Sequence, residues 1–171
     1  MYSVANEPRE RPMASPRAFA VIPAAGHSVR MGRPKLLLPY RDACIIDHVL
    51  SVWVDCVERV VVVVRSDDDV LAERCAAHDV DITRPISTPP DMKASVMIGL
   101  QHIQASYGPS ETDCWLLAPA DTPRISARDI KAVIGGYDPA APTPVLAAYD
   151  GRRGHPLLAP WSLVGQIEHL R

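Results

Sequence analysis

The most informative stretch of the chain reads Val21-Ile22-Pro23-Ala24-Ala25-Gly26-His27-Ser28-Val29-Arg30-Met31-Gly32-Arg33-Pro34-Lys35. An apolar strand end is followed by a glycine-bearing loop, an arginine and a lysine. Glycine permits backbone conformations and close approaches that bulkier residues block, so such a loop exposes backbone N–H groups. Arg30 can bind phosphate oxygens through two donors, and Lys35 adds a compact positive charge. The pattern indicates a triphosphate-binding loop, and a surface turn with solvated charges is the alternative.

Two common phosphate-binding patterns do not fit this stretch. No Gly-Lys-Ser/Thr follows, and Gly26 and Gly32 lie too far apart for a dinucleotide fingerprint. The spacing instead resembles the signature Ala-Ala-Gly-x-Ser-x-Arg-Met-Gly-x-x-Lys of the molybdenum cofactor nucleotidyltransferases, whose wider relatives are the sugar-phosphate nucleotidyltransferases. The nucleotide-binding residues implied by this resemblance are Ala24, Ala25, Gly26, Ser28, Arg30 and Lys35.

Composition bounds the class of protein. The chain has 171 residues, enough for one domain with a real core, and its 47% hydrophobic and 22% charged residues are ordinary for a globular protein. The formal net charge is −2 and no dense Lys/Arg stripe occurs, which argues against nucleic-acid binding. No apolar run approaches the length of a membrane helix. We therefore expect a cytoplasmic protein without a nucleic-acid or membrane partner, with a monomer favoured.

The cysteines and the N-terminus support this expectation. Cys44, Cys56, Cys75 and Cys114 are widely spaced within apolar segments, which favours free thiols in a reducing cytoplasm. The six histidines show no metal-ligand spacing. Residues 1–17 combine prolines and charges without an apolar stretch, so we expect a disordered lead-in before a folded domain over 18–171.

Strand and helix patterns alternate along the chain. Strands are predicted over 18–23, 60–64, 80–83 and 114–118, with a hairpin over 145–158. Helices are predicted over 44–57 with Asp42 as N-cap, over 66–78, after Asp91, and from Ser126 to Gly135 with a Ser126–Asp129 capping box. Five consecutive valines in the second strand describe a strand buried on both faces. The chain is therefore expected to form a single three-layer α/β domain with a mostly parallel sheet. The resemblance implies a Rossmann-like nucleotidyltransferase fold.

A candidate metal ligand follows the strand at 114–118. Parallel sheets bind ligands at the carboxyl ends of their strands, where both the glycine loop and Asp121 fall. Magnesium is usually held by one or two carboxylates together with substrate phosphates, so Asp121 suits a magnesium–triphosphate; a turn aspartate is the alternative. In the family that the chain resembles, a Gly/Ala-Asp-Met-Pro motif supplies the metal-binding aspartate. This chain keeps Asp121 and Pro123 but has Thr122 in place of the methionine.

Two further segments resemble family motifs. The stretch from Asp91 to Ser95 is similar to a Gly-Met-x-x-Ser segment that contacts the nucleoside. Asp91 replaces the glycine and could cap a helix or meet the ribose hydroxyls, while Ser95 is a candidate ligand or a plain helix N-terminal residue. The run Gly154-His155-Pro156 resembles a segment on the acceptor side of the cleft. The preceding residues, Arg152 and Arg153, could bind an acceptor phosphate, and the alternative is that both are solvated side chains on a turn.

The implied reaction is attack of an acceptor phosphate on the α-phosphorus of a nucleoside triphosphate, with release of pyrophosphate. Arg30, Lys35 and magnesium on Asp121 would act by positioning and charge neutralisation. No nucleophilic Ser or Cys with a paired base is apparent. The alanine pair before Gly26 resembles the CTP-using branch, because the GTP-using branch typically has two glycines. The implied donor is CTP and the implied acceptor is the phosphate of molybdopterin.

One departure from the family keeps other functions open. Family members usually continue past the Gly-His-Pro region with a segment and a later aspartate that completes the metal site, whereas this chain stops at Arg171. Glu168 has no matching context. A sugar- or alcohol-phosphate nucleotidyltransferase and a non-catalytic nucleotide-binding protein are therefore the alternatives.

Overall fold

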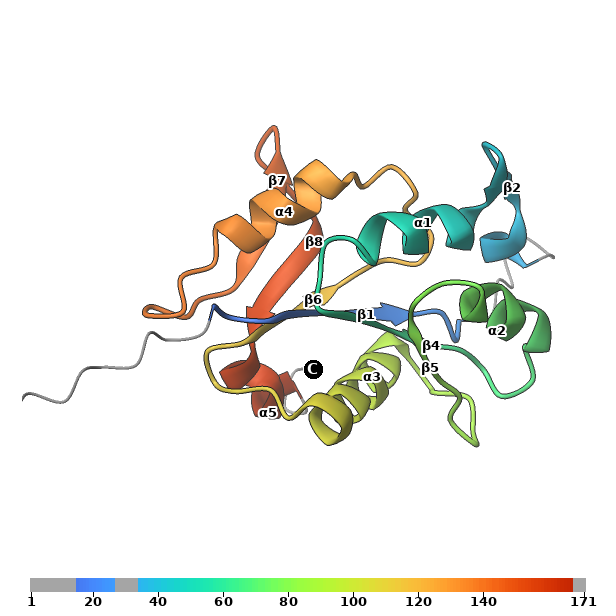
Figure 1. Ribbon diagram of the computed structural model, residues 1–171, viewed down its shortest axis with the longest axis horizontal. Helices are drawn as coiled ribbons and strands as arrows, with labels where there is room; N and C mark the ends of the chain where they lie inside the picture. The colour runs from blue at the N-terminus through green and yellow to red at the C-terminus, as the bar shows by residue number, and fades with distance from the viewer. Residues whose placement is uncertain (1–14, 27–33, 168–171) are drawn as a thin grey trace, which may run out of the picture.

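The computed structural model describes residues 15–26 and 34–167 (Figure 1). The predictions for Ser28, Arg30 and Glu168 fall outside these residues. Arg17, at the end of the expected lead-in, is bound to the body of the protein. Its guanidinium and its backbone N–H both donate to the buried carboxylate of Asp113.

A six-stranded sheet organises the described residues, in the order β5-β4-β1-β6-β8-β7. Its strands are β1 (Ala18–Pro23), β4 (Arg59–Val63), β5 (Asp81–Thr83), β6 (Cys114–Leu117), β7 (Val145–Tyr149) and β8 (Arg152–Pro160). The first four strands in this order are parallel, whereas β8 runs antiparallel to β6 and to β7. This arrangement confirms the predicted mostly parallel α/β sheet.

Helices cover both faces of the sheet and give three layers (Figure 1). The helices are α1 (Ile45–Trp53), α2 (Asp69–Ala76), α3 (Met92–Tyr107), α4 (Ala127–Gly135) and α5 (Val164–Ile167). Helices α1, α2 and α4 lie on one face, and α3 and α5 lie on the other. Shorter elements are the 3-10 turns η2 (Lys35–Leu37) and η3 (Trp161–Leu163) and the strand pair β2 (Pro39–Tyr40) and β3 (Ala43–Cys44). No described helix combines the length and apolar character needed to cross a bilayer.

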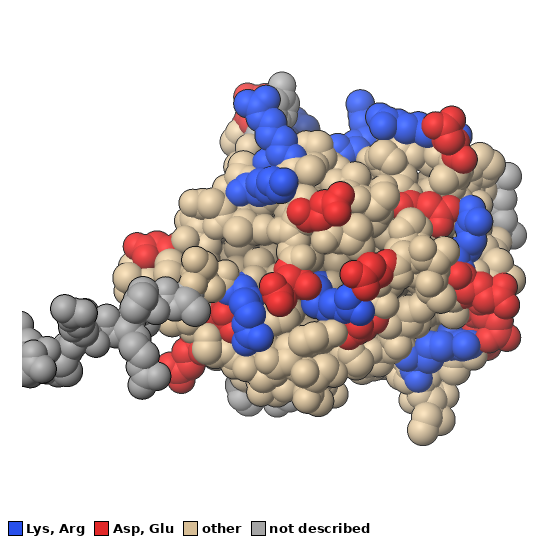
Figure 2. All heavy atoms as spheres, viewed as in Figure 1, with Lys and Arg blue, Asp and Glu red and all other residues tan. Residues whose placement is uncertain are grey.

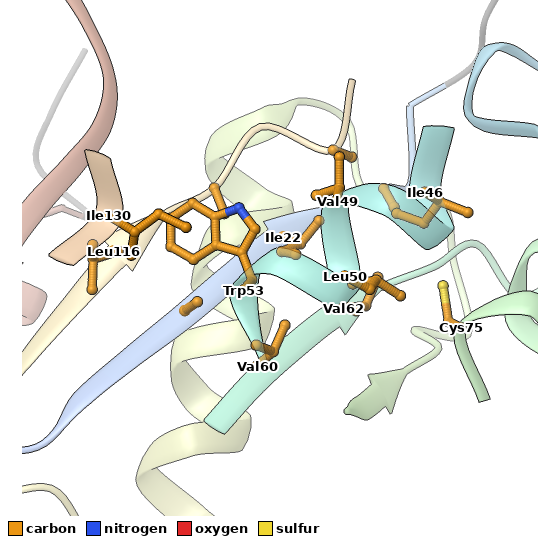
Figure 3. Packing of buried hydrophobic residues seen from close by; sticks show 14 of the residues in the cluster. Ile22, Ile46, Val49, Leu50, Trp53, Val60, Val62, Cys75, Leu116 and Ile130 are labelled. Carbon is orange, nitrogen blue, oxygen red and sulfur yellow. The ribbon is translucent and has the colours of Figure 1, made fainter. Parts of the chain in front are cut away.

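The core consists of two apolar clusters, one on each face of the sheet. Alternate valines of the β4 segment enter different clusters: Val60 and Val62 pack toward α1 and α2, whereas Val61 and Val63 pack toward α3. Figure 3 shows the first cluster, with Trp53 of α1 beside residues of α4 and β6. All these valines are buried, as predicted for a strand covered on both faces.

The start of α1 differs from its prediction. Asp42 was predicted to cap a helix over 44–57, but the N-cap is Cys44 and the helix ends at Trp53. Residues 43 and 44 pair with β2, so Asp42 lies in the turn between the two short strands. The Cys44 thiol and backbone N–H both donate to Asp47, which completes a capping box.

The remaining predictions hold to within a few residues. Helix α2 begins two to three residues later than predicted, because Asp68 accepts from the backbone of Leu71 and serves as N-cap. Helix α4 has the predicted Ser126–Asp129 capping box, and β7 and β8 form the predicted hairpin. All four cysteines are free thiols, and three are buried while Cys56 is partly exposed.

Candidate active site

The parallel strands bring the two predicted site segments to one edge of the sheet. Ala24 follows β1 and Ala118 follows β6, and both strands end at this edge because they are parallel neighbours. The backbone ladder continues past the strand ends, since Ala24 N donates to Val63 O and Ala118 N donates to Val21 O. These bonds fix the start of the glycine loop beside the segment that carries Asp121.

Lys35 and Asp121 meet at this edge. The Lys35 Nζ atom donates to Asp121 Oδ2 at 2.7 Å, and the two side chains are 39% and 46% exposed. The Thr122 hydroxyl lies 3.4 Å from the other carboxylate oxygen, Oδ1. The hydrogen bond from Lys35 holds the pKa of Asp121 below its usual range, against the effect of partial burial. The pair therefore presents an ionised, solvent-accessible carboxylate beside an ammonium group.

Of the described residues 24–26 at the start of the glycine loop, only Gly26 is exposed. Gly26 is exposed, and a Cβ added to it would meet no atom within 4 Å. Ala24 and Ala25 are only 4% and 3% exposed, and they pack in the two apolar clusters on opposite faces of the sheet. Their methyl groups are thus occupied by core contacts. This arrangement gives no steric reason for the alanine pair to favour CTP over GTP.

Arg65 is a cation at the same edge that the sequence analysis did not assign to the site. It follows the end of β4, and its Nη1 lies 3.5 Å from the carbonyl oxygen of Gly26. Its side chain is only 16% exposed, and its guanidinium pairs with Asp67 at 2.8 Å and with Asp68 at 3.5 Å. The signal for it was its position: it follows a buried parallel strand at the edge where ligands bind.

The helix that follows β5 also begins at this edge, because it runs back along the sheet. Asp91 is the N-cap of α3 and accepts from Ala94 N at 2.7 Å, which is the capping role foreseen for it. Ser95 is 4% exposed, and its hydroxyl donates to the Asp91 carbonyl oxygen at 3.2 Å. The structure therefore gives Ser95 a contact within the first turn and leaves little of its surface for a ligand.

The Gly154-His155-Pro156 run lies within β8, near the same edge. Strand β8 runs antiparallel to β6, and Leu157 pairs with Leu117, the last residue of β6. The residues before Leu157 therefore extend past the end of β6 toward the segment of Asp121. Gly154 and His155 are exposed, and Pro156 is buried. Within the sheet, the run therefore lies on the β8 side of the segment that carries Asp121, away from β4.

The donor set can accommodate a hard divalent cation only with help from a substrate. No group of three His, Cys, Asp or Glu side chains within 15–26 and 34–167 could hold a metal ion by itself. Asp121 nevertheless offers an accessible carboxylate, and the Lys35 ammonium already occupies the position of a cation on Oδ2. Carboxylate oxygens combined with phosphate oxygens and water are what magnesium prefers. The site therefore fits a cation that arrives with phosphates.

Charges of both signs are intermixed over the face drawn in Figure 2. No broad patch of one sign covers that face. The face drawn there therefore lacks the continuous basic surface that binds long polyanions.

Comparisons with known proteins agree with the fold described above. The family model described as MobA-like NTP transferase domain matches residues 20–171. A curated relative, the probable molybdenum cofactor guanylyltransferase of Bacillus cereus (strain AH820), is 28% identical over 142 residues, covering 77% of this chain and 68% of the relative.

Solved structures share the fold at low identity. The Rv0371c protein of Mycobacterium tuberculosis H37Rv in complex with manganese superposes with a TM-score of 0.71 at 20% identity, covering 90% of this chain and 76% of that one. A 4-diphosphocytidyl-2C-methyl-D-erythritol synthase superposes with a TM-score of 0.72 at 19% identity, covering 92% and 81%. These likenesses support the nucleotidyltransferase fold.

Proposed function

The chain belongs to the MobA-like NTP transferase domain family, and on this premise we propose that it transfers a cytidylyl group from CTP to the phosphate of molybdopterin. The Lys35–Asp121 pair at the sheet edge is the observation that carries the proposal. It combines a phosphate-binding cation with a metal-binding carboxylate at the sheet edge where the exposed Gly26 also lies. The curated relatives, named for molybdenum cofactor guanylyltransfer, support the acceptor class.

The proposed chemistry is an in-line displacement at phosphorus. An oxygen of the acceptor phosphate attacks the α-phosphorus of the nucleotide and forms a new P–O bond. The bond from the α-phosphorus to the bridging oxygen breaks, and its electron pair leaves with pyrophosphate. Because the acceptor is already an anion, no base is needed to remove a proton. Catalysis then rests on positioning and on neutralising charge.

Several residues of the candidate site have distinct roles in this proposal. Lys35 binds oxygens of the departing phosphates, and the backbone of Ala25 and Gly26 faces the triphosphate, next to Ala24, whose N–H donates to Val63 O. Asp121 holds magnesium, with manganese as a substitute suggested by the manganese complex of a structural neighbour. When bound, the divalent ion would screen the charge of the phosphates. Arg30 and Ser28 are proposed as further phosphate ligands on the strength of the sequence motif.

The acceptor is proposed to bind on the β8 side. Gly154 and His155 are exposed there, next to the exposed arginines 152 and 153 of the hairpin. An arginine can bind a phosphate through two parallel hydrogen bonds. Donor and acceptor phosphates would therefore approach Lys35 and Asp121 from neighbouring strands.

GTP is the second candidate donor. The curated relatives are named guanylyltransferases, whereas the case for CTP rests on the alanine pair in the loop. Competition binding of CTP against GTP to the purified protein distinguishes the two. A preference of tenfold or more for CTP, which corresponds to about 1.4 kcal/mol, supports the cytidylyl assignment. Equal or tighter binding of GTP assigns a guanylyltransferase without altering the rest of the proposal.

A further inference from the structure

In the ion pair between Lys35 and Asp121, the lysine ammonium competes with the proposed metal ion for the same carboxylate oxygen. Oδ2 of Asp121 accepts from Lys35 Nζ at 2.7 Å, so the ammonium lies where a metal ion would bind that oxygen. A divalent cation and an ammonium group on one carboxylate oxygen repel each other. The same ammonium is also the proposed partner of the nucleotide phosphates. This inference rests on the proposed function.

We propose that Lys35 is an exchangeable cation that keeps divalent metal off Asp121 until nucleotide phosphates draw the ammonium away. Metal and nucleotide then bind with positive coupling, and Lys35 carries that coupling. Coupling of this kind is reciprocal, because each ligand must raise the affinity for the other by the same factor.

The surroundings of Lys35 suit an exchange that moves the side chain alone. Leu36 and Leu37 of η2 pack against the core cluster and hold the backbone of the turn in place. The Lys35 side chain is 39% exposed, and a lysine stem is flexible. The ammonium can therefore swing from the carboxylate to a phosphate without rearrangement of the turn.

The surroundings of Asp121 favour a carboxylate that stays in place during the exchange. The Thr122 hydroxyl contacts Oδ1, on the opposite side from Lys35. Backbone bonds from Thr122 N to Pro119 O and from Ile125 N to Thr122 O shape the turn that carries Asp121. Oδ2 therefore remains available to a cation when Lys35 departs.

The test measures binding of Mn²⁺ as the probe, by electron paramagnetic resonance of the free ion, in the 171-residue chain. Lys35→Gln removes the ammonium and keeps a polar side chain. Arg124→Gln is the matched control, because it removes one positive charge from an exposed side chain three positions after Asp121. Each protein is titrated with Mn²⁺ alone and again with saturating CTP, and circular dichroism checks that each variant is folded.

We expect Lys35→Gln to bind Mn²⁺ alone about threefold to fivefold more tightly than the wild type, on the scale of an exposed ion pair. Arg124→Gln should change this affinity by less than twofold. CTP should tighten Mn²⁺ binding strongly in the wild type and less in Lys35→Gln. Unchanged, weaker or undetectable Mn²⁺ binding by Lys35→Gln without nucleotide overturns the exchange, as does an equal rise in the control.

The two arms separate this inference from the proposed function. The Mn²⁺-only arm tests the exchange without any nucleotide. If wild-type protein binds neither CTP nor GTP at any Mn²⁺ concentration, the proposed function fails, together with the part of the exchange assigned to nucleotide. If nucleotide binds but Lys35→Gln gains no affinity for Mn²⁺ alone, only the exchange fails.

Discussion

Lys35 and Asp121 lie 86 positions apart in the chain, yet the Lys35 ammonium donates to the Asp121 carboxylate at 2.7 Å. The contact joins the end of the glycine loop segment after β1 to the turn after β6. Parallel pairing of β1 and β6 brings both segments to the same edge of the sheet. A phosphate-binding motif and a metal-binding motif thus become one site through the topology of the sheet.

Replacing Lys35 should weaken nucleotide binding. We expect Lys35→Ala to lose about 2 kcal/mol of CTP binding free energy, because a charge-assisted hydrogen bond to phosphate is lost. Isothermal titration calorimetry with CTP and Mg²⁺ measures this loss. Lys131→Ala, at an exposed position of α4, is the control and should bind as the wild type does. Wild-type affinity in Lys35→Ala would remove this lysine from the site.

Replacing Asp121 should abolish the metal dependence of nucleotide binding while sparing the fold. Asp121→Asn keeps the shape of the side chain and removes its charge. Because both side chains of the ion pair with Lys35 are partly exposed, we expect the free energy of unfolding to change by less than about 1 kcal/mol. Titrations with CTP in Mg²⁺ and in EDTA measure the metal dependence of nucleotide binding, and urea unfolding measures the free energy of unfolding. Asp55→Asn, at an exposed position after α1, should retain full metal dependence; a response in Asp121→Asn equal to this control's would refute the assignment.

Close packing of α3 on β1 should make Gly99 intolerant of a side chain. A Cβ added at Gly99 would lie 2.5 Å from Cγ1 of Val21, which is fully buried. We expect Gly99→Ala to lower the free energy of unfolding by about 1–3 kcal/mol, the usual scale of overpacking. Gly135→Ala meets open space at the end of α4 and should be neutral or stabilising by up to about 1 kcal/mol. Urea denaturation of both variants measures the difference, and equal stabilities would contradict the packing described.

Asp113 should make the fold sensitive to acid. Burial alone would raise the pKa of this carboxyl, but hydrogen bonds from Arg17 and Ser110 outweigh burial and lower its pKa. The pKa of an aspartate in the unfolded chain is about 3.9. The contribution of ionised Asp113 to the free energy of unfolding is therefore complete above that pH, and it is lost as the pH falls through the lower pKa of the folded state. We expect Asp113→Asn to cost about 1–3 kcal/mol at pH 7. The difference from wild type should shrink below about pH 4 in urea unfolding, and a difference independent of pH would contradict this role.

Much of the fold could be predicted because local patterns and topology agree. The valine run of β4 has no polar face, so only a strand covered on both sides suits it. The start of α1 was mispredicted because Asp42 is the better N-cap by type, whereas the short β2–β3 pair moves it into a turn. Cys44 is therefore the N-cap of α1, although cysteine is not a residue that local propensity favours at this position.

The candidate site was predictable where a residue follows a parallel strand and also matches a motif. Lys35 and Asp121 meet both conditions. Arg65 meets only the first, and an arginine after a strand is ordinarily a solvated flank, so its contact with the Gly26 carbonyl had to come from the structure. Ser95 matched a motif, but the first turn of α3 buries it.

The most direct test of the proposed function is product formation from purified molybdopterin. The protein is incubated with Mg²⁺, molybdopterin and CTP, GTP or UTP in turn, with sugar and alcohol phosphates as alternative acceptors. Pyrophosphate release and the mass of the product are measured. We predict cytidylylated molybdopterin and an equal amount of pyrophosphate, with at least tenfold less product from Asp121→Asn. Nucleotide binding without pyrophosphate release for every donor and acceptor, or transfer only to a sugar or alcohol phosphate, would contradict the account.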